Sequence, residues 1–425
     1  MRIPAFLGAA DMKLVASRQS RLLAYCAVLA SLSVHAAETP QSALANAVER
    51  AWRLNPQAAG LDAREAEVRA ARDVAAGLTP KPGSLSIGSL NDRLDRNRGK
   101  QEYEAELALP LWLPGQKAAR EAEAASRIDE AIAKRAALRL ALSGELREAW
   151  WALAAARSAT ALAARRLETA RALETDVVRR YQVGELSRID ANLAQTETHV
   201  AHAELIEAEA ALLQAEQAVQ TLTGSPAPRD LDEESPATRR TAAETGDSAE
   251  SHPLLAAAAT TARSARARVQ VADESRRAAP ELALRLVRER GGFSESYSNS
   301  VGIKLKIPFS FASQVRRETS AAQAEANQAD AEMQRSHVRV RLDTERAQRQ
   351  LQSAERQLAM AQERRLLAAE NLRLAEKAFS LGESDLTSLL RIRAAAFAAD
   401  AFSDRQRVAR AAAISRLNQA LGVLP

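Results

Sequence analysis

The sequence predicts a mainly α-helical protein with a small β part, built from one structural unit that occurs twice. Three observations support this fold class. The composition is poor in aromatic residues, at 4%, and rich in Ala, Leu, Arg, Glu and Gln, which favours long helices. Apolar residues recur at alternating spacings of four and three over very long stretches, as in coiled coils. Several prolines and glycines of the first half also have a counterpart of the same type 198 positions later.

Residues 1–36 have the features of a signal peptide for export. Arg18 and Arg21 precede an uncharged run from Leu22 to Ala37, and Val34-His35-Ala36 matches an A-x-A-like cleavage pattern. The formal net charge of +5 includes four Lys/Arg and one Asp from this segment, so the mature chain is close to neutral. That balance does not favour nucleic-acid binding.

Two residues in this segment bear on how the N-terminus is processed. Met12 is an alternative start, because translation from it would give a signal peptide of ordinary length. Cys26 could be the lipidated residue of a lipoprotein, but Tyr25 stands where such signals have a small residue. We therefore expect an unlipidated mature chain without cysteine. No later uncharged run approaches 18 residues, so we expect no transmembrane helix.

An internal duplication organises the rest of the chain. Asn55-Pro56 and His252-Pro253 lie one residue off the common register, each with Pro in a position suited to open a helix. We expect 37–224 and 252–425 to be two repeats, joined at 225–251 by a polar linker that is loop or partly disordered. The pairs that lie 198 residues apart are Pro82 and Pro280, Pro110 and Pro308, Gly184 and Gly382, and Gly224 and Gly422.

Each repeat is expected to contain a helix, two strands, a long helix, a turn and a return helix. A long helix of this size would extend roughly 100 Å. The first helix and the return helix together nearly equal that length, so they could stack end to end along it. The ranges predicted for the first repeat are a helix over 57–78, strands over 84–90 and 101–109, a long helix over 116–181 and a return helix over 187–222. Those predicted for the second repeat are strands over 281–288 and 298–307, a long helix over 315–380 and a return helix over 385–421.

The long helices carry a seam in which large apolar residues alternate with alanine, which lets helices approach closely. The adjacent Trp150 and Trp151 point about 100° apart on a helix, so we expect packing and not ligand stacking. The seam residues include Leu142, Leu146, Leu153, Leu167, Ala170 and Val177 in the first repeat, and Leu351, Ala354, Leu358, Ala361, Leu372, Ala375 and Phe379 in the second.

The second strand of each repeat alternates between apolar and polar residues. A strand in a soluble sandwich would alternate in the same way, but four strands among such long helices leave the apolar face uncovered. A membrane barrel covers that face with lipid, and Lys304 and Lys306 would then line its lumen. The apolar residues are Tyr103, Ala105, Leu107 and Leu109, and Val301, Ile303, Leu305 and Ile307.

Four strands cannot close a barrel, because unpaired edges leave backbone groups unsatisfied in a bilayer. We expect three copies to supply twelve strands, which is enough to enclose an aqueous lumen. The first strands are less regular than the second strands. Leu85 and Ile87 fall on one phase and Leu282, Leu284 and Leu286 on the other, so a one-residue slip or bulge is expected.

Two related turns connect the long helices to the return helices. Gly184 can take the left-handed conformation that closes a helix. Ser187 can cap the following helix, with Asp190 completing an imperfect capping box. In the second repeat Gly382 matches Gly184, and Asp385 takes the cap position.

Taken together, the signal peptide, the duplicated unit, the prolines at the strand exits and the glycine turns resemble the TolC family of outer-membrane efflux proteins. The resemblance covers nearly all of the mature chain. It implies a homotrimer with a twelve-stranded outer-membrane β-barrel and a long periplasmic α-helical tunnel. It also implies two partners, a periplasmic adaptor and an inner-membrane pump. The stretch Leu109–Gln116 resembles the heavy-metal cation efflux branch more than the drug efflux branch.

By the same resemblance, the two turns become the periplasmic tips that close the pore and contact the adaptor. The alternative reading is that the charged residues there are helix caps or solvated turn charges. The residues that the resemblance assigns to the tip are Tyr181, Gly184, Glu185, Ser187, Arg188, Asp190, Gly382, Glu383, Asp385 and Ser388.

The sequence contains no phosphate-binding glycine loop, no G-x-S-x-G and no H-E-x-x-H motif. His199 and His202 are weak metal candidates, because they lie three apart on a helix. Without a cysteine or a further histidine nearby, the sequence favours ordinary polar positions. We therefore expect no enzymatic activity, no resident metal and no cofactor.

The expected function is that of an exit duct in a tripartite efflux or type I secretion system, passing substrate, such as metal cations, to the exterior. The alternative is a soluble periplasmic coiled-coil scaffold or adaptor, although adaptors carry one hairpin flanked by small β-domains. An enzyme of cell-envelope turnover is the third possibility, and the missing catalytic motifs disfavour it.

Overall fold

The computed structural model of the chain describes residues 42–237, 252–309 and 311–425. Residues Ala43–Pro425 form one compact unit by their internal contacts. The predicted signal peptide, with Met12 and Cys26, lies outside the described residues, as does the 238–251 part of the predicted linker.

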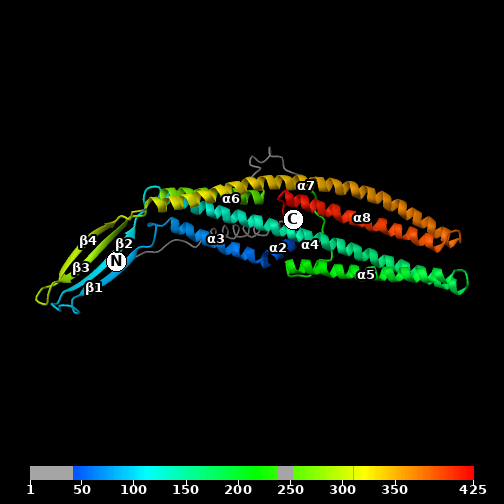
Figure 1. The fold of residues 1–425 in the computed structure, drawn as a ribbon, viewed down its shortest axis with the longest axis horizontal. Helices are drawn as coiled ribbons and strands as arrows, with labels where there is room; N and C mark the ends of the chain where they lie inside the picture. The colour runs from blue at the N-terminus through cyan, green and yellow to red at the C-terminus, as the bar shows by residue number, and fades with distance from the viewer. Residues whose placement is uncertain (1–41, 238–251, 310) are drawn as a thin grey trace, which may run out of the picture. The chain divides into compact units, whose positions relative to one another are not determined.

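The unit consists of seven described helices and four strands (Figure 1). A short helix, α2, precedes the first predicted helix, and Asn55 separates the two. The first repeat contains α2 (Ala43–Leu54), α3 (Pro56–Ala75), β1 (Ser84–Asn91), β2 (Gln101–Pro110), α4 (Gln116–Gln182) and α5 (Arg188–Thr223). The second contains α6 (Pro253–Glu274), β3 (Glu281–Arg290), β4 (Ser298–Lys306), α7 (Ala312–Ser380) and α8 (Leu386–Ala420).

The helices pack as the predicted seams and lengths indicate. Helices α3 and α5 lie along successive parts of α4, and α6 and α8 lie along successive parts of α7 (Figure 1). The two repeats meet where α4 contacts α6 and α8. Seam residues such as Leu146, Leu153 and Val177 are fully buried. Within the described part of the chain, no helix combines the length and apolar character needed to cross a membrane.

The two tryptophans belong to the core, as the packing interpretation predicted. Trp150 and Trp151 are buried in a cluster with Leu44, Val48 and Leu146. The Trp151 indole N–H donates to Ser415 Oγ at 2.7 Å, which satisfies its polar group inside the core.

The strands form one antiparallel sheet in the order β1-β2-β3-β4. Pairing places Leu85, Leu107, Leu284 and Ile303 in one row across the sheet. The next row on the same face holds Ile87, Ala105, Leu286 and Val301. Because neighbouring residues of a strand point to opposite faces, the glutamates of β2 and the lysines of β4 share the other face.

The expected slip between the first strands is real, but it lies in the hairpin loop and not in a strand. Leu85 pairs with Leu107, and Leu282 pairs with Leu305. Leu305 follows Leu107 by 198 residues, whereas Leu282 follows Leu85 by 197. All three strand pairs run without interruption, so the extra residue of the second repeat is accommodated between β3 and β4. The bulge expected as an alternative is absent from these pairings.

The described part of the linker, 225–237, has no helix or strand but is firmly attached to the helices. Glu234 forms an ion pair with Arg147 at 2.6 Å. The Ala237 amide donates to Asn418 Oδ1 at 2.8 Å. This half of the expected linker is therefore an ordered loop, here called the strap, that crosses α4 and α8, which agrees with the loop alternative for these residues.

Candidate functional site

The first candidate surface is the polar face of the sheet, which carries paired charges. Lys304 Nζ lies 3.3 Å from Glu106 Oε2, and Lys306 Nζ lies 3.1 Å from Glu281 Oε2. Arg285 Nη2 donates to Glu104 Oε2 at 2.8 Å. Exposed pairs of this kind contribute little to stability, about 0–1 kcal/mol each. Their consequence is a hydrophilic surface on which positive charges have carboxylate partners.

The opposite face of the sheet is apolar and exposed in a single chain. Ile87 and Ile303 are 81% and 79% exposed, and the apolar residues around them are also exposed. An apolar surface of this extent marks contact with a membrane or a partner. The edges β1 and β4 each lack a neighbour in the single-chain sheet. The sheet therefore has one wettable face, one apolar face and two open edges.

The two helix turns have the local geometry that the sequence predicted. Gly184 and Gly382 have φ angles of 85° and 77°, in the left-handed region. Ser187 and Asp190 form a reciprocal capping box, with the Ser187 amide donating to Asp190 Oδ2 at 3.0 Å. In the second repeat the Ser388 amide donates to Asp385 Oδ1 at 2.9 Å.

The charges at the turns divide into local pairs and exposed groups. Hydrogen bonds from the Ser388 side chain and amide hold the pKa of Asp385 below its ordinary value. Glu185 pairs with Arg180 at 3.2 Å, within the same hairpin. Arg188 and Glu383 are exposed on the turns. Of the predicted tip residues, Asp190 and Asp385 thus serve as caps, and none of these contacts joins one turn to the other.

The contact between the two hairpins comes largely from arginines that sequence analysis did not identify. Arg393 of α8 pairs with Glu376 of α7 at 2.8 Å and donates to the carbonyl of Thr169 in α4 at 3.2 Å. The Arg180 guanidinium lies 5.1 Å from the centroid of the Phe379 ring. These contacts join the α4–α5 hairpin to the α7–α8 hairpin, with the Arg180–Phe379 contact in the last helical turn before the tips and the Arg393 contacts farther from them.

An apolar cluster lies beneath these arginines. The cluster gives both hairpins one shared core near their ends. Its buried members are Leu173, Val177, Ala194, Ala375, Phe379, Leu386 and Leu389.

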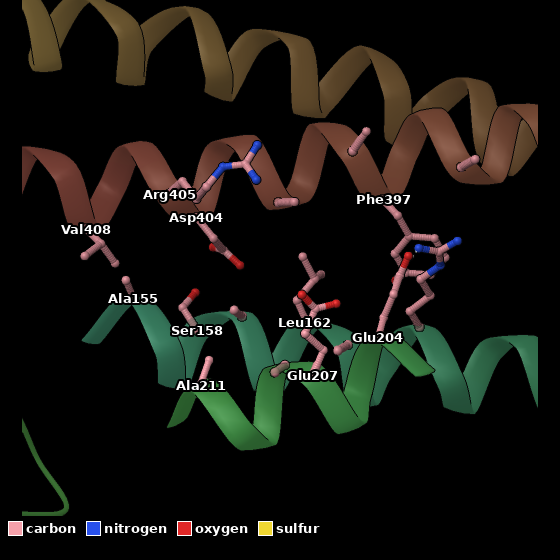
Figure 2. A pocket seen from close by; sticks show the side chains of 17 residues that line it. Ala155, Ser158, Leu162, Glu204, Glu207, Ala211, Phe397, Asp404, Arg405 and Val408 are labelled. Atoms are coloured by element: carbon pink, nitrogen blue, oxygen red, sulfur yellow. Dashed lines mark hydrogen bonds and ion pairs between the residues drawn. The ribbon is translucent and has the colours of Figure 1, made fainter. Parts of the chain in front are cut away.

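A cavity of about 550 Å³ lies farther along the helices, between α4, α5 and α8. Figure 2 shows Glu204 and Glu207 projecting from α5, with Phe397, Asp404 and Arg405 on α8 across the cavity. Arg166 of α4 spans one end, where it pairs with Glu204 and lies 2.9 Å from Glu197. Alanines form most of the remaining wall, so the cavity arises where small seam residues leave the helices unfilled.

The described residues include no group of three or more His, Cys, Asp or Glu side chains that could hold a metal ion. His199 and His202 are both exposed on α5. The surfaces with functional character are therefore the two faces of the sheet and the paired helix turns.

Comparison with known proteins places these features in a broader context. A family model described as outer membrane efflux protein matches residues 246–423. No curated protein matches the sequence.

Several solved structures share the fold over most of the chain. The outer membrane protein VceC of Vibrio cholerae is 16% identical, with a TM-score of 0.71 and coverage of 89% of this chain and 96% of that one. The MtrE outer membrane channel of Neisseria gonorrhoeae, in its open state, is 17% identical, with a TM-score of 0.72 and coverage of 89% of each chain. CusC, from a study of transmembrane channel formation, is 16% identical, with a TM-score of 0.73 and coverage of 89% and 92%.

Proposed function

We propose, from the match of residues 246–423 to the outer membrane efflux protein family and from the shared fold, that three copies of this chain form one continuous duct across the outer membrane and the periplasm. We infer that the chain is an outer-membrane efflux channel with a helical periplasmic extension, because its second repeat matches that family and its fold is shared with the outer membrane protein VceC. The trimer, the partners and the substrate are the parts that we add to this identity.

The observation that carries the proposal is the sheet with open edges and unlike faces. Backbone groups at a sheet edge cannot remain unpaired inside a bilayer. If β4 of one copy pairs with β1 of the next, three copies give a closed ring of twelve strands. The apolar face then contacts lipid, and the face with Lys304 and Lys306 surrounds water.

The helices have open edges of the same kind. In the half of the helices that leads to the two turns, their contacts give the lateral order α5-α4-α8-α7. Helices α5 and α7 are therefore the outer members. Met360, Leu367 and Leu374 are exposed on α7 at intervals of seven residues, and Ile206 and Leu213 are exposed at the same interval on α5. Residues spaced by seven lie on one side of a helix. We infer that α7 of one copy packs on α5 of the next, continuing the ring below the membrane.

Transport through such a duct is passive. Hydrated substrate would move along the polar sheet face and the polar faces of the helices, with selectivity set by charges at narrow points. Energy and direction would come from an inner-membrane pump joined through a periplasmic adaptor, or from a type I secretion system. We assign closure and adaptor contact to the tip residues, with Arg188 and Glu383 as the exposed charges.

The test is oligomeric state and conductance of the purified mature chain. We expect a heat-modifiable trimer in detergent and discrete single-channel currents in planar bilayers. Outer-membrane fractionation of cells should recover the same trimer. A water-soluble monomer without conductance would support the periplasmic scaffold or adaptor and would refute the duct.

For the substrate, we propose metal cations. The support is the stretch Leu109–Gln116, whose similarity is to the heavy-metal branch of the family. A deletion strain should become sensitive to metal cations, and a panel of drugs provides the comparison. Sensitivity to drugs with unchanged tolerance of metals would contradict the metal assignment.

A further inference from the structure

Two arginines interrupt the apolar face of the sheet near the hairpin loops. Arg288 and Arg290 share this face with Leu282, Leu284 and Leu286, because all five occupy alternate positions of β3. The Arg288 guanidinium lies 4.7 Å from the centroid of the Tyr297 ring, and that of Arg290 lies 5.0 Å from the same centroid. Two positive charges are therefore gathered around one aromatic ring.

These arginines differ from the cations of the polar face. There, Arg285, Lys304 and Lys306 each have a carboxylate within 4 Å. The contacts of Arg288 and Arg290 are with aromatic rings, and Arg290 Nε also donates to the carbonyl of Gly99 at 3.2 Å. The cross-strand neighbours of Arg288 are the uncharged Tyr103 and Asn299. The pair thus has positive charge that these neighbours do not neutralise.

A hollow in the apolar face adjoins Arg288. It has a volume of about 520 Å³, and its lining includes Ile87, Tyr103, Leu286 and Val301. Ala105 occupies the middle of this row, between Ile87 and Leu286. The small alanine between large side chains leaves an apolar depression that ends at a guanidinium group.

We propose that this surface binds a phosphate-bearing lipid of the outer leaflet, with the phosphate on Arg288 and Arg290 and an acyl chain in the hollow at Ala105. Guanidinium groups bind phosphate through short, charge-assisted hydrogen bonds. Because the hollow beside the arginines is apolar, it favours a lipid with an acyl chain over free phosphate. The proposal rests on the proposed function, which directs the apolar face toward lipid.

The position of the arginines along the strand fits this assignment. The row of Tyr103 and Arg288 lies roughly 20 Å from the row of Leu109 and Leu282, at about 3.4 Å per residue. That span approaches the apolar band of a membrane barrel, about 25 Å tall. With the helices in the periplasm, the hairpin loops face outward, and the arginines reach the outer headgroup region. Lipid-facing arginine costs little free energy there.

The test is lipid affinity of the full chain in detergent, measured by native mass spectrometry with diphosphorylated lipid A as the probe. We expect the wild type to bind it at least tenfold more tightly than lipid A stripped of both phosphates. Inorganic phosphate at the same concentration should not displace it. The double variant Arg288→Gln/Arg290→Gln should lose affinity by roughly thirty-fold. Arg285→Gln, on the same strand but the other face, should bind as the wild type does.

Three results would overturn the proposal: equal affinity for the two forms of lipid A, displacement by inorganic phosphate, or an equal loss in Arg285→Gln. If the double variant does not assemble, the wild-type comparison of the two lipids decides alone. Wild-type conductance in bilayers of digalactosyl diacylglycerol, which carries no phosphate, tests the duct separately. A conducting wild type that does not discriminate the lipids refutes the lipid site and leaves the duct intact.

Discussion

At the residue scale, Arg147 is the most consequential charge in the helices. It is 2% exposed, and it bonds to Glu234, to Gln419 and to the carbonyl of Val423. A buried charge is tolerated only when its hydrogen-bonding groups are satisfied. Its three partners come from the linker strap, α8 and the C-terminal segment, so one guanidinium fastens together segments that are distant in the sequence.

We predict that Glu234→Ala lowers the free energy of unfolding by about 3–5 kcal/mol, because it leaves the Arg147 charge buried without its partner. Arg416→Ala is the matched control. Arg416 also joins α8 to α4, through Glu148 at 2.9 Å, but both side chains are about half exposed. Its loss should cost less than about 1 kcal/mol. Thermal unfolding of the two variants side by side measures the difference, and equal destabilisation would contradict the assignment to burial.

His252 makes one helix start dependent on pH. Its Nδ1 accepts a hydrogen bond from the Leu254 amide at 3.2 Å, which requires the neutral ring. Burial lowers the pKa of His252 below its ordinary value, against a smaller opposing effect of the Ala420 backbone. The unfolded chain therefore binds the proton more readily. Stability from this group is complete above about pH 6.5 and falls as the pH drops below that value.

The first repeat supplies the variant that tests this pH dependence. Asn55 caps α3 at the position matching His252, accepting from the Gln57 amide at 2.8 Å. In His252→Asn the cap should persist without a titrating group. We expect the loss of thermal stability between pH 7 and pH 5 to be smaller in the variant than in the wild type. An identical loss would show that other groups cause it.

Sequence analysis succeeded at this scale where the interaction is local. The capping of α5 by Ser187 and Asp190 could be predicted, because both partners lie within four residues of each other. The bonds of Arg147 and Arg393 could not, because Arg393 and Thr169 are 224 residues apart. Nothing in the local sequence separates these arginines from the many solvated ones.

At the element scale, the glycine that follows α4 differs from a glycine inside a helix in the backbone conformation that it adopts. Gly184 has a φ of 85° and no atom near an added Cβ, so substitution there would meet backbone strain alone. Gly60, within α3, also has open space around it but has helical geometry. We predict that Gly184→Ala destabilises the protein by about 1–2 kcal/mol. Gly60→Ala should stabilise it by about 0.5–1 kcal/mol. Chemical denaturation measures the change in the free energy of unfolding for both variants. If both changes had the same sign, the left-handed backbone would not be the reason for glycine at position 184.

We predict that loss of the Arg393 contacts between the two hairpins changes the conductance of the channel. Arg393→Ala removes the ion pair with Glu376 and the bond to Thr169 that join α8 to α7 and α4. If the hairpin ends form the closed end of the duct, the variant should open more often, and mean single-channel conductance should rise severalfold. Arg391→Ala, two residues away on the same helix, is the control. Unchanged conductance in Arg393→Ala would show that the Arg393 contacts do not help to close the duct.

The period of the apolar residues was sufficient to predict the helices and their seams, because long helices impose a spacing that few other structures share. The pairing of the first strands was not predictable in detail. A one-residue difference in a hairpin loop changes which residues face each other while leaving each strand's alternation intact. The sequence indicated that a slip existed, and only the backbone of β3 and β4 located it.

At the scale of the whole molecule, the edges β1 and β4 allow the trimer to be tested by cross-linking. Two strands separate β1 from β4, so at about 4.8 Å per strand they lie roughly 14 Å apart within one chain. A disulfide needs Cα atoms within about 7 Å. Any disulfide between cysteines placed on these two edges must therefore join different copies.

We place one cysteine at Ser86 on β1 and, in a series of variants, a second cysteine at each position of β4 from Ser298 to Lys304. We predict that disulfide-linked products form at one register of β4 against β1. The expected ladder on a denaturing, non-reducing gel ends at three chains, because a closed ring leaves no free edge. Cysteines at Glu104 of β2 and Ser300 of β4 provide the control, since another strand lies between them. Absence of any ladder would contradict pairing of β4 with β1. A ladder that continues beyond three would show that the sheets associate as an open chain and do not enclose a lumen.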